Sequence, residues 1–280
     1  MVKKVGILYH PLKKDAQALA EKLGSFLAAE GLNIWLCSAW EEEKAKSQVN
    51  GTDLLLTVGG DGTILRAAQA AIPGSTPVTG VNLGRLGFMT ELGIDEVMEQ
   101  LPALLAGKGW YDERHLLEAE LSPAGVEAEA GRPFYALNDV VVARGAAVRL
   151  IHVEVEINGA RLATCRADGV IVATATGSTG YSLAAGGPIL HPRSDDFLLV
   201  PIVPHLSQGY PIVLSHTSVV NLHLTSAHSA MLSVDGHINL PLSTGANIIV
   251  RHSSKTIRFL RIHREASFYA SLEERLKGKQ

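Results

Sequence analysis

The chain is poor in cysteine: its 280 residues include only Cys37 and Cys165, and no CxxC motif or His/Cys cluster has the spacing of a zinc site. Two isolated cysteines favour free thiols in a reducing cytoplasm over a disulfide framework. No apolar run approaches the length of a membrane span, and the apolar stretch 5–9 is too short for a signal peptide. These absences predict a cytoplasmic protein with no metal cluster of its own.

Net charge and aromatic residues are also scarce. The net charge is −3 at pH 7, and aromatic residues make up 5% of the chain. So small a net charge gives no overall attraction to nucleic acid or to anionic membranes, and we expect neither as a partner. What the chain does contain is glycine, 27 residues in all, which is typical of a compact fold with many tight turns.

The first third of the chain alternates strand and helix patterns. Four short apolar runs are typical of strands: 5–9, 33–37, 54–58 and 77–82. Three segments carry apolar residues at helical spacing: 15–30, 64–72 and 95–105. This rhythm predicts an α/β domain, a Rossmann-like parallel sheet with helices on both faces.

After about Trp110 the pattern changes to alternating apolar and polar residues. The expected strands are 116–121, 134–143, 149–157, 161–164, 170–174, 197–203, 218–224, 230–234, 247–251 and 257–263. Asn158-Gly159 predicts a hairpin turn. An all-β, sandwich-like domain follows, and the helical segment 271–277 is expected to return to the first domain. The predicted boundaries are 1–110 with 265–280 for the α/β domain and 111–264 for the all-β domain.

Gly59-Gly60-Asp61-Gly62-Thr63 lies between the apolar run 54–58 and the helical pattern that starts at Ile64. A strand therefore runs into a glycine turn that opens a helix, where backbone N–H groups can meet phosphate. An acid in such a loop repels phosphate unless it binds a sugar hydroxyl, a metal ion or a proton. The alternative is a tight turn with Asp61 or Thr63 as the helix N-cap.

The segment 167–188 contains a buried strand followed by a loop rich in glycine and hydroxyl groups. Its hydroxyls can donate to and accept from a ligand, and its glycines let backbone amides face that ligand. The loop contains no lysine and is therefore not a P-loop. The alternative is a turn of small residues between β elements.

Asn138-Asp139 precedes a valine-rich strand and is expected at the strand end. An amide together with a carboxylate can hold a ribose diol or an adenine edge through paired hydrogen bonds. An Asx turn that starts the strand is an equally good interpretation of this pair alone.

Taken together, these three motifs resemble the NAD kinase family. Further similarities are a GxLGF-like loop at 84–90, a Pro-His turn at 204–206 and a late Asp-Gly turn at 233–236. The resemblance extends from about Val5 to Tyr269. GGDGT by itself is shared with phosphofructokinases and with diacylglycerol and sphingosine kinases, whereas its combination with the TGST block is specific.

The resemblance implies transfer of a phosphoryl group from ATP to the 2′-hydroxyl of the adenosine ribose of NAD⁺, which gives NADP⁺. It implies Mg²⁺ or another divalent cation with the ATP, and a homodimer or homotetramer. Asp61 would contact the 2′-hydroxyl and accept its proton. The other ligand-binding positions that it implies are Gly62, Arg66, Phe88, Asn138, Asp139, Arg149, Arg166, Asp168, Thr176, Thr179, Gly180, Tyr181, Ser182, Leu183, Ala184, Val203 and His237.

Four of these positions depart from the family's usual residues. Asp139 stands in place of glutamate, Gly180 in place of alanine, Ala184 in place of serine and His237 in place of glutamine. Two rival functions are a lipid or sphingoid-base kinase that shares GGDGT and a dinucleotide sensor without turnover. The hydroxyl-rich loop and the lack of a basic amphipathic segment argue against the lipid kinase.

Overall fold

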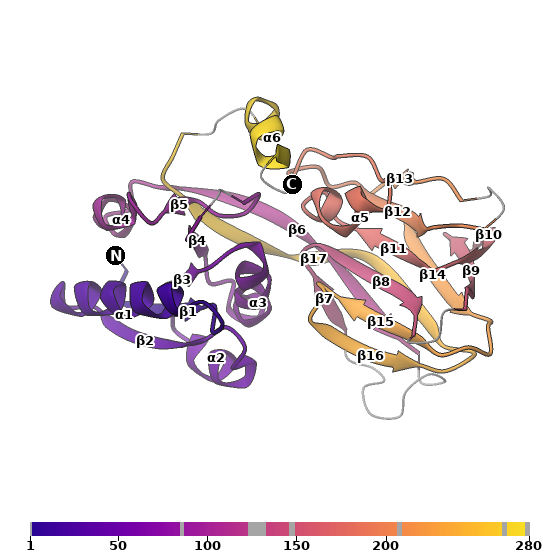
Figure 1. The fold of residues 1–280 in the computed structure, drawn as a ribbon, viewed down its shortest axis with the longest axis horizontal. Helices are drawn as coiled ribbons and strands as arrows, with labels where there is room; N and C mark the ends of the chain where they lie inside the picture. Colours follow the sequence, from indigo (N-terminus) through magenta and orange to yellow (C-terminus); the bar gives the residue numbers. More distant parts are fainter. Residues whose placement is uncertain are drawn as a thin grey trace. The chain divides into compact units, whose positions relative to one another are not determined.

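The computed structural model describes residues 2–84, 87–122, 133–145, 149–205, 209–264 and 268–277. The chain divides into two compact units, Met1–Glu113 with Thr256–Gln280, and Arg114–Lys255 (Figure 1). The divisions fall inside two long strands, β6 (Trp110–Leu121) and β17 (Asn247–Arg261). The strands expected at 247–251 and 257–263 are therefore one, since the polar residues between them continue the strand.

The first unit contains a parallel sheet in the order β2-β1-β3-β4. Its strands are β1 (Lys4–Tyr9), β2 (Asn33–Ser38), β3 (Leu54–Val58), β4 (Val78–Asn82) and the short β5 (Leu92–Gly93) beside β4. Its helices are α1 (Lys14–Ala29), α2 (Glu42–Val49), α3 (Asp61–Ala71), α4 (Val97–Leu105) and α6 (Phe268–Lys277), and a 3-10 turn follows α3 at Ile72–Gly74. The predicted Rossmann-like sheet is confirmed.

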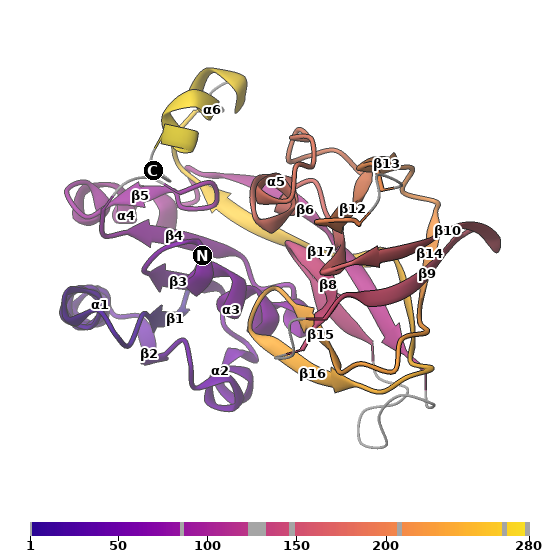
Figure 2. The ribbon, with the colours of Figure 1, turned by 45° about the vertical axis from the view of Figure 1, so that its right-hand side comes forward.

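Helices cover both faces of this sheet (Figure 2). Leu54 and Leu56 of β3 pack in one cluster with Leu23 of α1 and Leu101 of α4. On the opposite face α3 approaches so closely that a Cβ at Gly80 would lie 2.5 Å from the Ile64 side chain. Each buried leucine contributes roughly 1.5–3 kcal/mol relative to exposure, so the packing of the helices on the sheet stabilises this unit.

Helix α2 is not among the helices expected from the sequence. The helix spans only eight residues and buries two side chains, those of Ala45 and Val49. So short an apolar stripe gives almost no periodic signal. Helix α3 also begins earlier than predicted, at Asp61 instead of Ile64, because glycines at its start do not show the helical pattern.

The second unit is a sandwich of two antiparallel sheets. One contains β10-β9-β14-β17, with β7 paired to β6; the other has the order β13-β12-β11-β8-β15-β16. The strands are β7 (Phe134–Ala136), β8 (Asp139–Arg144), β9 (Ile151–Ile157), β10 (Ala160–Ala167), β11 (Gly169–Ala173), β12 (Phe197–Ile202), β13 (Ile212–Leu214), β14 (Val219–Leu224), β15 (Ala230–Val234) and β16 (Ile238–Leu242). The hairpin turn between β9 and β10 is confirmed, with Asn158 at φ 53° and Gly159 at φ 78°.

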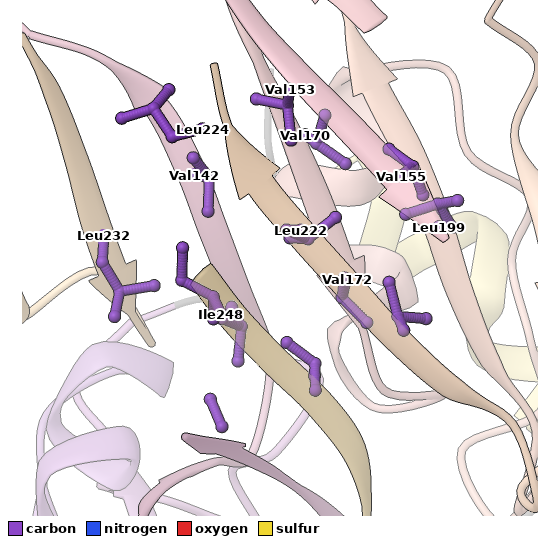
Figure 3. Packing of buried hydrophobic residues seen from close by; sticks show 14 of the residues in the cluster. Val142, Val153, Val155, Val170, Val172, Leu199, Leu222, Leu224, Leu232 and Ile248 are labelled. Carbon is purple, nitrogen blue, oxygen red and sulfur yellow. The ribbon is translucent and has the colours of Figure 1, made fainter. Parts of the chain in front are cut away.

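The core of the second unit lies between its two sheets (Figure 3). Val170 and Val172 of β11 pack there against residues such as Val155 and Leu222 of the facing sheet. The alternate residues Ile171 and Ala173 are buried in a separate cluster on the outer face. Ala185 and Leu190, from the segment after β11, pack against that outer cluster. Strand β11 is therefore apolar on both faces, and this packing holds the glycine-rich loop against the sheet.

Candidate active site

The turn between β3 and α3 places Asp61 at the first residue of the helix. Gly60 precedes it in an extended conformation, with φ −104° and ψ −168°, and no side chain caps the helix from that position. Gly59 has no room for a side chain, because a Cβ there would lie 2.2 Å from the hydroxyl oxygen of Thr63. Glycine at this position therefore allows the strand to enter the helix through so tight a turn.

The Asp61 carboxylate is held by the loop that follows β4. Its Oδ2 accepts a hydrogen bond from the N–H of Phe88 at 3.0 Å, and its Oδ1 accepts one from the N–H of Met89 at 3.1 Å. A Cβ at Gly87 would lie 2.3 Å from Oδ1, so the loop backbone approaches as closely as glycine allows. The carboxylate is thus oriented by a second loop.

These contacts leave the carboxylate able to act on a ligand. Asp61 is only half-buried. A carboxylate oxygen has two lone pairs, so each oxygen can accept from a ligand hydroxyl in addition to the backbone N–H. A carboxylate held in one orientation can align a hydroxyl and accept its proton.

Gly62 and Arg66 lie on the same helix as Asp61. Gly62 is exposed directly beside the acid, and a Cβ there would meet nothing within 4 Å. Arg66 is half-buried, with its guanidinium carbon 4.3 Å from the centre of the Trp40 ring. The stacking on Trp40 holds the Arg66 guanidinium on the same helix as Asp61. A cation in that place can bind a phosphate beside the acid.

Phe88 helps to orient Asp61 through its backbone N–H, a contact that the identity of its side chain does not predict. Its half-buried ring lies with its centre 6.0 Å from the guanidinium carbon of Arg275. Arg85 and Leu86, which belong to the predicted GxLGF-like loop, lie outside the described residues.

In the second unit, Asn138 and Asp139 lie at a turn held by the buried carboxylate of Asp235. That carboxylate accepts N–H bonds from Leu137 at 2.9 Å, from Asn138 at 2.7 Å and from Asp139 at 3.2 Å. The N–H of Asp235 donates in return to the carbonyl of Asp139 at 3.0 Å. The expectation of one strand over 134–143 is therefore wrong in its middle, because these amides bond a side chain where the chain passes from β7 to β8.

Asp235 belongs to the predicted late Asp-Gly turn, but the sequence does not reveal that its carboxylate holds the turn of Asn138 and Asp139. It lies in the turn between β15 and β16 at φ 50°, followed by Gly236 at φ 72°. The local Val-Asp-Gly order predicts a turn and nothing more. It does not indicate that the carboxylate serves Asp139, which lies 96 residues earlier in the chain.

Burial changes the ionisation of these two acids. It raises the pKa of Asp139 to about 7, and the negative charge of Asp235 adds to the rise. Burial also raises the pKa of Asp235, against the opposing effect of its three N–H donors. Because neighbouring carboxyls titrate as a pair, Asp139 can donate a hydrogen bond as a neutral carboxyl near neutral pH as well as accept one.

The loop after β11 is joined to the same turn. Thr174 donates from its hydroxyl to the carbonyl of Leu137 at 2.6 Å and from its N–H to the carbonyl of Asn138 at 2.9 Å. The N–H of Gly177 donates to the Thr174 hydroxyl at 3.0 Å. A Cβ at Gly177 would lie 2.0 Å from the Asn138 carbonyl oxygen, so only glycine fits and the two segments form one structural element.

Several hydroxyls of this loop have partners within the protein. The Ser178 hydroxyl donates to a loop carbonyl at 2.7 Å and accepts from the N–H of Leu190 at 3.0 Å. Thr179 donates to the carbonyl of Thr176 at 3.3 Å, and the Thr176 hydroxyl accepts from Arg114 at 3.3 Å. These hydroxyls therefore stabilise the shape of the loop.

Two polar atoms beside the loop, Asn138 Oδ1 and Ser182 Oγ, are buried without a hydrogen-bond partner among the described residues. A buried polar group without a partner costs about 1–3 kcal/mol, which a ligand that bonds it would recover. Gly180 borders the same place, where a Cβ would lie 3.6 Å from Asn138 Nδ2. The predicted residues Tyr181, Ser182, Leu183 and Ala184 form the short helix α5 (Tyr181–Ala184), and Tyr181 is 48% exposed.

Four further predicted residues lie on other segments of the second unit. Arg149 and Arg166 are exposed. Asp168 accepts a hydrogen bond from Nε of Arg144 at 2.7 Å, an ion pair that holds this acid beside β8. Val203 is 69% exposed and lies at φ 44°, a strained backbone conformation for a β-branched residue.

His237 follows the Asp235 turn directly. Its Nδ1 lies 3.1 Å from the carbonyl oxygen of Asp235, which favours a proton on Nδ1 and leaves Nε2 as an acceptor. In the predicted Pro-His turn, the N–H of His205 donates to the carbonyl of Arg166 at 2.8 Å. Leu206, the last residue of that turn, lies outside the described residues.

Comparison with known proteins decides between the functional interpretations. Residues 33–109 match the ATP-NAD kinase N-terminal domain, and residues 137–262 match the ATP-NAD kinase C-terminal domain. The NAD kinase of Dehalococcoides mccartyi is 50% identical over 278 residues, which cover 99% of this chain and 97% of that protein. The chain belongs to the NAD kinase family.

Two other similarities agree with this membership. The NAD kinase of Chloroflexus aurantiacus is 41% identical over 277 residues, 99% of each chain. The crystal structure of yeast NADH kinase complexed with NADH superposes with a TM-score of 0.86 at 27% identity, covering 99% of this chain and 88% of that one. None of these matches supports the lipid kinase or the sensor.

The described residues also bear on two other kinds of feature, membrane-spanning helices and metal sites. They contain no helix that is both long and apolar enough to cross a membrane. They also contain no group of three or more His, Cys, Asp or Glu side chains arranged to hold a metal ion.

Proposed function

We propose that Asp61 is the group through which this enzyme acts on its acceptor. The enzyme phosphorylates the 2′-hydroxyl of the adenosine ribose of NAD⁺ with ATP and produces NADP⁺. In the proposal, the carboxylate aligns the 2′-hydroxyl and accepts its proton as the new P–O bond forms. The observation that supports this role is the orientation of the carboxylate by the N–H groups of Phe88 and Met89 at the start of α3.

The donor is proposed to arrive as ATP with a bound divalent cation, Mg²⁺ being the ordinary choice. A cation that bridges the donor's phosphates neutralises the charge that develops on the transferred group. Around Asp61, the exposed Gly62 backbone and the cation of Arg66 are the groups proposed to meet phosphate. Because phosphoryl transfer proceeds through a loose transition state, positioning contributes more than activation of the hydroxyl.

The dinucleotide is proposed to bind the turn and loop of the second unit. Asn138 offers a buried Oδ1 that has no hydrogen-bond partner among the described residues, and Asp139 offers a carboxyl that can both donate and accept. The other positions proposed to contact it are Phe88, Arg149, Arg166, Asp168, Thr176, Thr179, Gly180, Tyr181, Ser182, Leu183, Ala184, Val203 and His237. In this proposal the α/β unit carries the nucleotide-binding GGDGT turn and the all-β unit carries the dinucleotide pocket.

The assembly and the location of the protein complete the proposal. A homodimer or homotetramer in the cytoplasm is expected. The exposed Val203 and Tyr210, 69% and 76% accessible, support burial of this region in an assembly. Light scattering of the purified protein tests the assembly, and a monomer at micromolar concentration would contradict it.

The activity is tested by incubating the protein with NAD⁺, ATP and Mg²⁺ and measuring NADP⁺ with an NADP⁺-specific dehydrogenase. Wild-type protein is expected to form NADP⁺, and omission of ATP should abolish it. An Asp61→Asn variant that forms NADP⁺ at the wild-type rate would overturn the role of Asp61 and leave the activity itself standing.

A further inference from the structure

The loop that orients Asp61 is itself held by two arginines on its carbonyl side. Arg275 of α6 donates from Nη1 to the carbonyl of Gly87 at 2.7 Å and to the carbonyl of Phe88 at 3.0 Å. Arg261 of β17 donates from Nη1 to the carbonyl of Met89 at 2.8 Å. The loop therefore lies between cations on one side and the Asp61 carboxylate on the other.

The bonds of Arg275 and those of Asp61 meet on the same two peptide groups. The Gly87 carbonyl and the Phe88 N–H belong to one peptide group, which accepts from Arg275 and donates to Asp61 Oδ2. The Phe88 carbonyl and the Met89 N–H belong to the next, which accepts from Arg275 and donates to Asp61 Oδ1. Each oxygen of the carboxylate is thus linked to one guanidinium nitrogen through a single planar amide.

Such a linkage has two physical consequences. A cation on a carbonyl polarises the amide and strengthens the hydrogen bond that its N–H donates. Two anchored peptide planes also fix the directions of the two N–H groups, and therefore the rotation of the carboxylate about its own axis. The orientation of Asp61 depends in this way on Arg275, a residue near the other end of the chain.

We propose that Arg275 is a positioning residue for Asp61 and acts through the peptide groups of Gly87–Met89. The inference rests on the proposed role of Asp61. Arg261 supports the same loop from its other end, but it is buried among Glu91 and Asp112, with ion-pair distances of 3.2 Å and 3.3 Å. Its removal would break the ion pairs of two buried carboxylates, so Arg275 is the better residue to test.

The side chain of arginine suits this role better than that of lysine. A guanidinium nitrogen carries two N–H bonds in one plane, which can reach two successive carbonyls at once, whereas an ammonium group is a compact, mobile point charge. Lys277 of the same helix is a matched control. It is exposed and forms an ion pair only with a residue of its own helix, Glu273, among the described contacts.

The test compares Arg275→Met, Arg275→Lys and Lys277→Met as full-length proteins. Arg275→Met is expected to lower kcat for NADP⁺ formation by roughly tenfold to a hundredfold, since misplacement of a catalytic group by about 1 Å has effects of that size. Its KM values for NAD⁺ and ATP should change by less than about threefold, because ground-state binding is not removed. Arg275→Lys should lie between wild type and Arg275→Met, and Lys277→Met should match the wild type.

Two further readouts separate positioning from simple docking of the helix. Added guanidinium ion at millimolar concentration should partly restore kcat in Arg275→Met and leave Lys277→Met unchanged. Hydrogen exchange of the Phe88 and Met89 amides should accelerate in Arg275→Met without any substrate, while amides of β1 and β3 keep their protection.

The outcomes are distinguishable. Wild-type kcat in Arg275→Met, or a rise in KM with kcat unchanged, would overturn the inference while Asp61→Asn still tests the proposed function by itself. If Arg275→Met does not fold, Arg275→Lys with unchanged kcat and unchanged exchange at Phe88 and Met89 would equally overturn it.

Discussion

The two units each hold an aspartate with backbone N–H groups, but they use the acid differently. Asp61 accepts two N–H bonds and stays half-buried, so that its oxygens can still accept from a ligand. Asp235 accepts three N–H bonds and is 6% exposed. The same type of hydrogen bond thus orients the proposed catalytic carboxylate in one unit, and in the other it fixes the turn that carries Asn138 and Asp139.

The largest effect is expected from removing the charge of Asp61. Asp61→Asn keeps the size of the side chain but cannot accept the proton, so kcat should fall by roughly a hundredfold to ten-thousandfold. Binding of NAD⁺, measured by calorimetry, should change much less. Asp15→Asn, at an exposed position of α1, serves as the control. A comparable loss of kcat in both variants would contradict the special role of Asp61.

A matched pair of glycine variants compares the two regions next. Gly87→Ala would bring a Cβ to 2.3 Å from Asp61 Oδ1, whereas Gly180→Ala would meet the Gly177 carbonyl oxygen at 3.2 Å. We expect Gly87→Ala to lower kcat by roughly tenfold or more, and Gly180→Ala to change kcat and the KM for NAD⁺ by less than about threefold. Steady-state kinetics check both, and the reverse order would show that the loop of the second unit is the less tolerant one.

Asp235→Asn tests whether the second acid is structural. Its amide would point N–H bonds at backbone donors, so the free energy of unfolding should fall by about 1–3 kcal/mol in urea denaturation. The pKa of Asp139 should fall as well, because the negative charge that helps to raise it is gone. An unchanged urea midpoint, together with an unchanged pKa of Asp139 measured by carbon NMR, would contradict a structural role of Asp235.

The smallest effect is a difference in the pH dependence of stability. The pKa of Asp139 is raised to about 7 in the folded protein from an ordinary value of 3.8, so the folded state keeps a proton that the unfolded chain loses. The contribution of this group is therefore fully present below about pH 4 and is lost as the pH rises to about 7. Asp139→Asn should lack this loss, so that its unfolding free energy relative to wild type rises by about 1 kcal/mol or more between about pH 4.5 and about pH 7.5. Parallel curves for the two proteins would contradict the raised pKa.

Much of the architecture could be predicted from the sequence because local patterns decide it. The alternation of apolar runs with helical spacing indicated the parallel sheet of the first unit, and Asn158-Gly159 indicated the hairpin of the second. Helix α2 and the start of α3 were missed or misplaced, since two buried side chains or a run of glycines carry too little periodic signal.

The sequence by itself determined which chemical groups are available to the proposed site: the acid in a glycine turn, the amide–acid pair and the hydroxyl-rich loop, each formed by residues adjacent in the chain. Only the tertiary structure decided what holds them. The links from Asp61 to Phe88 and Arg275, and from Asp139 to Asp235, join residues far apart in the chain. A hydrogen bond depends on distance and direction in space, which folding sets and which no local pattern of residues records.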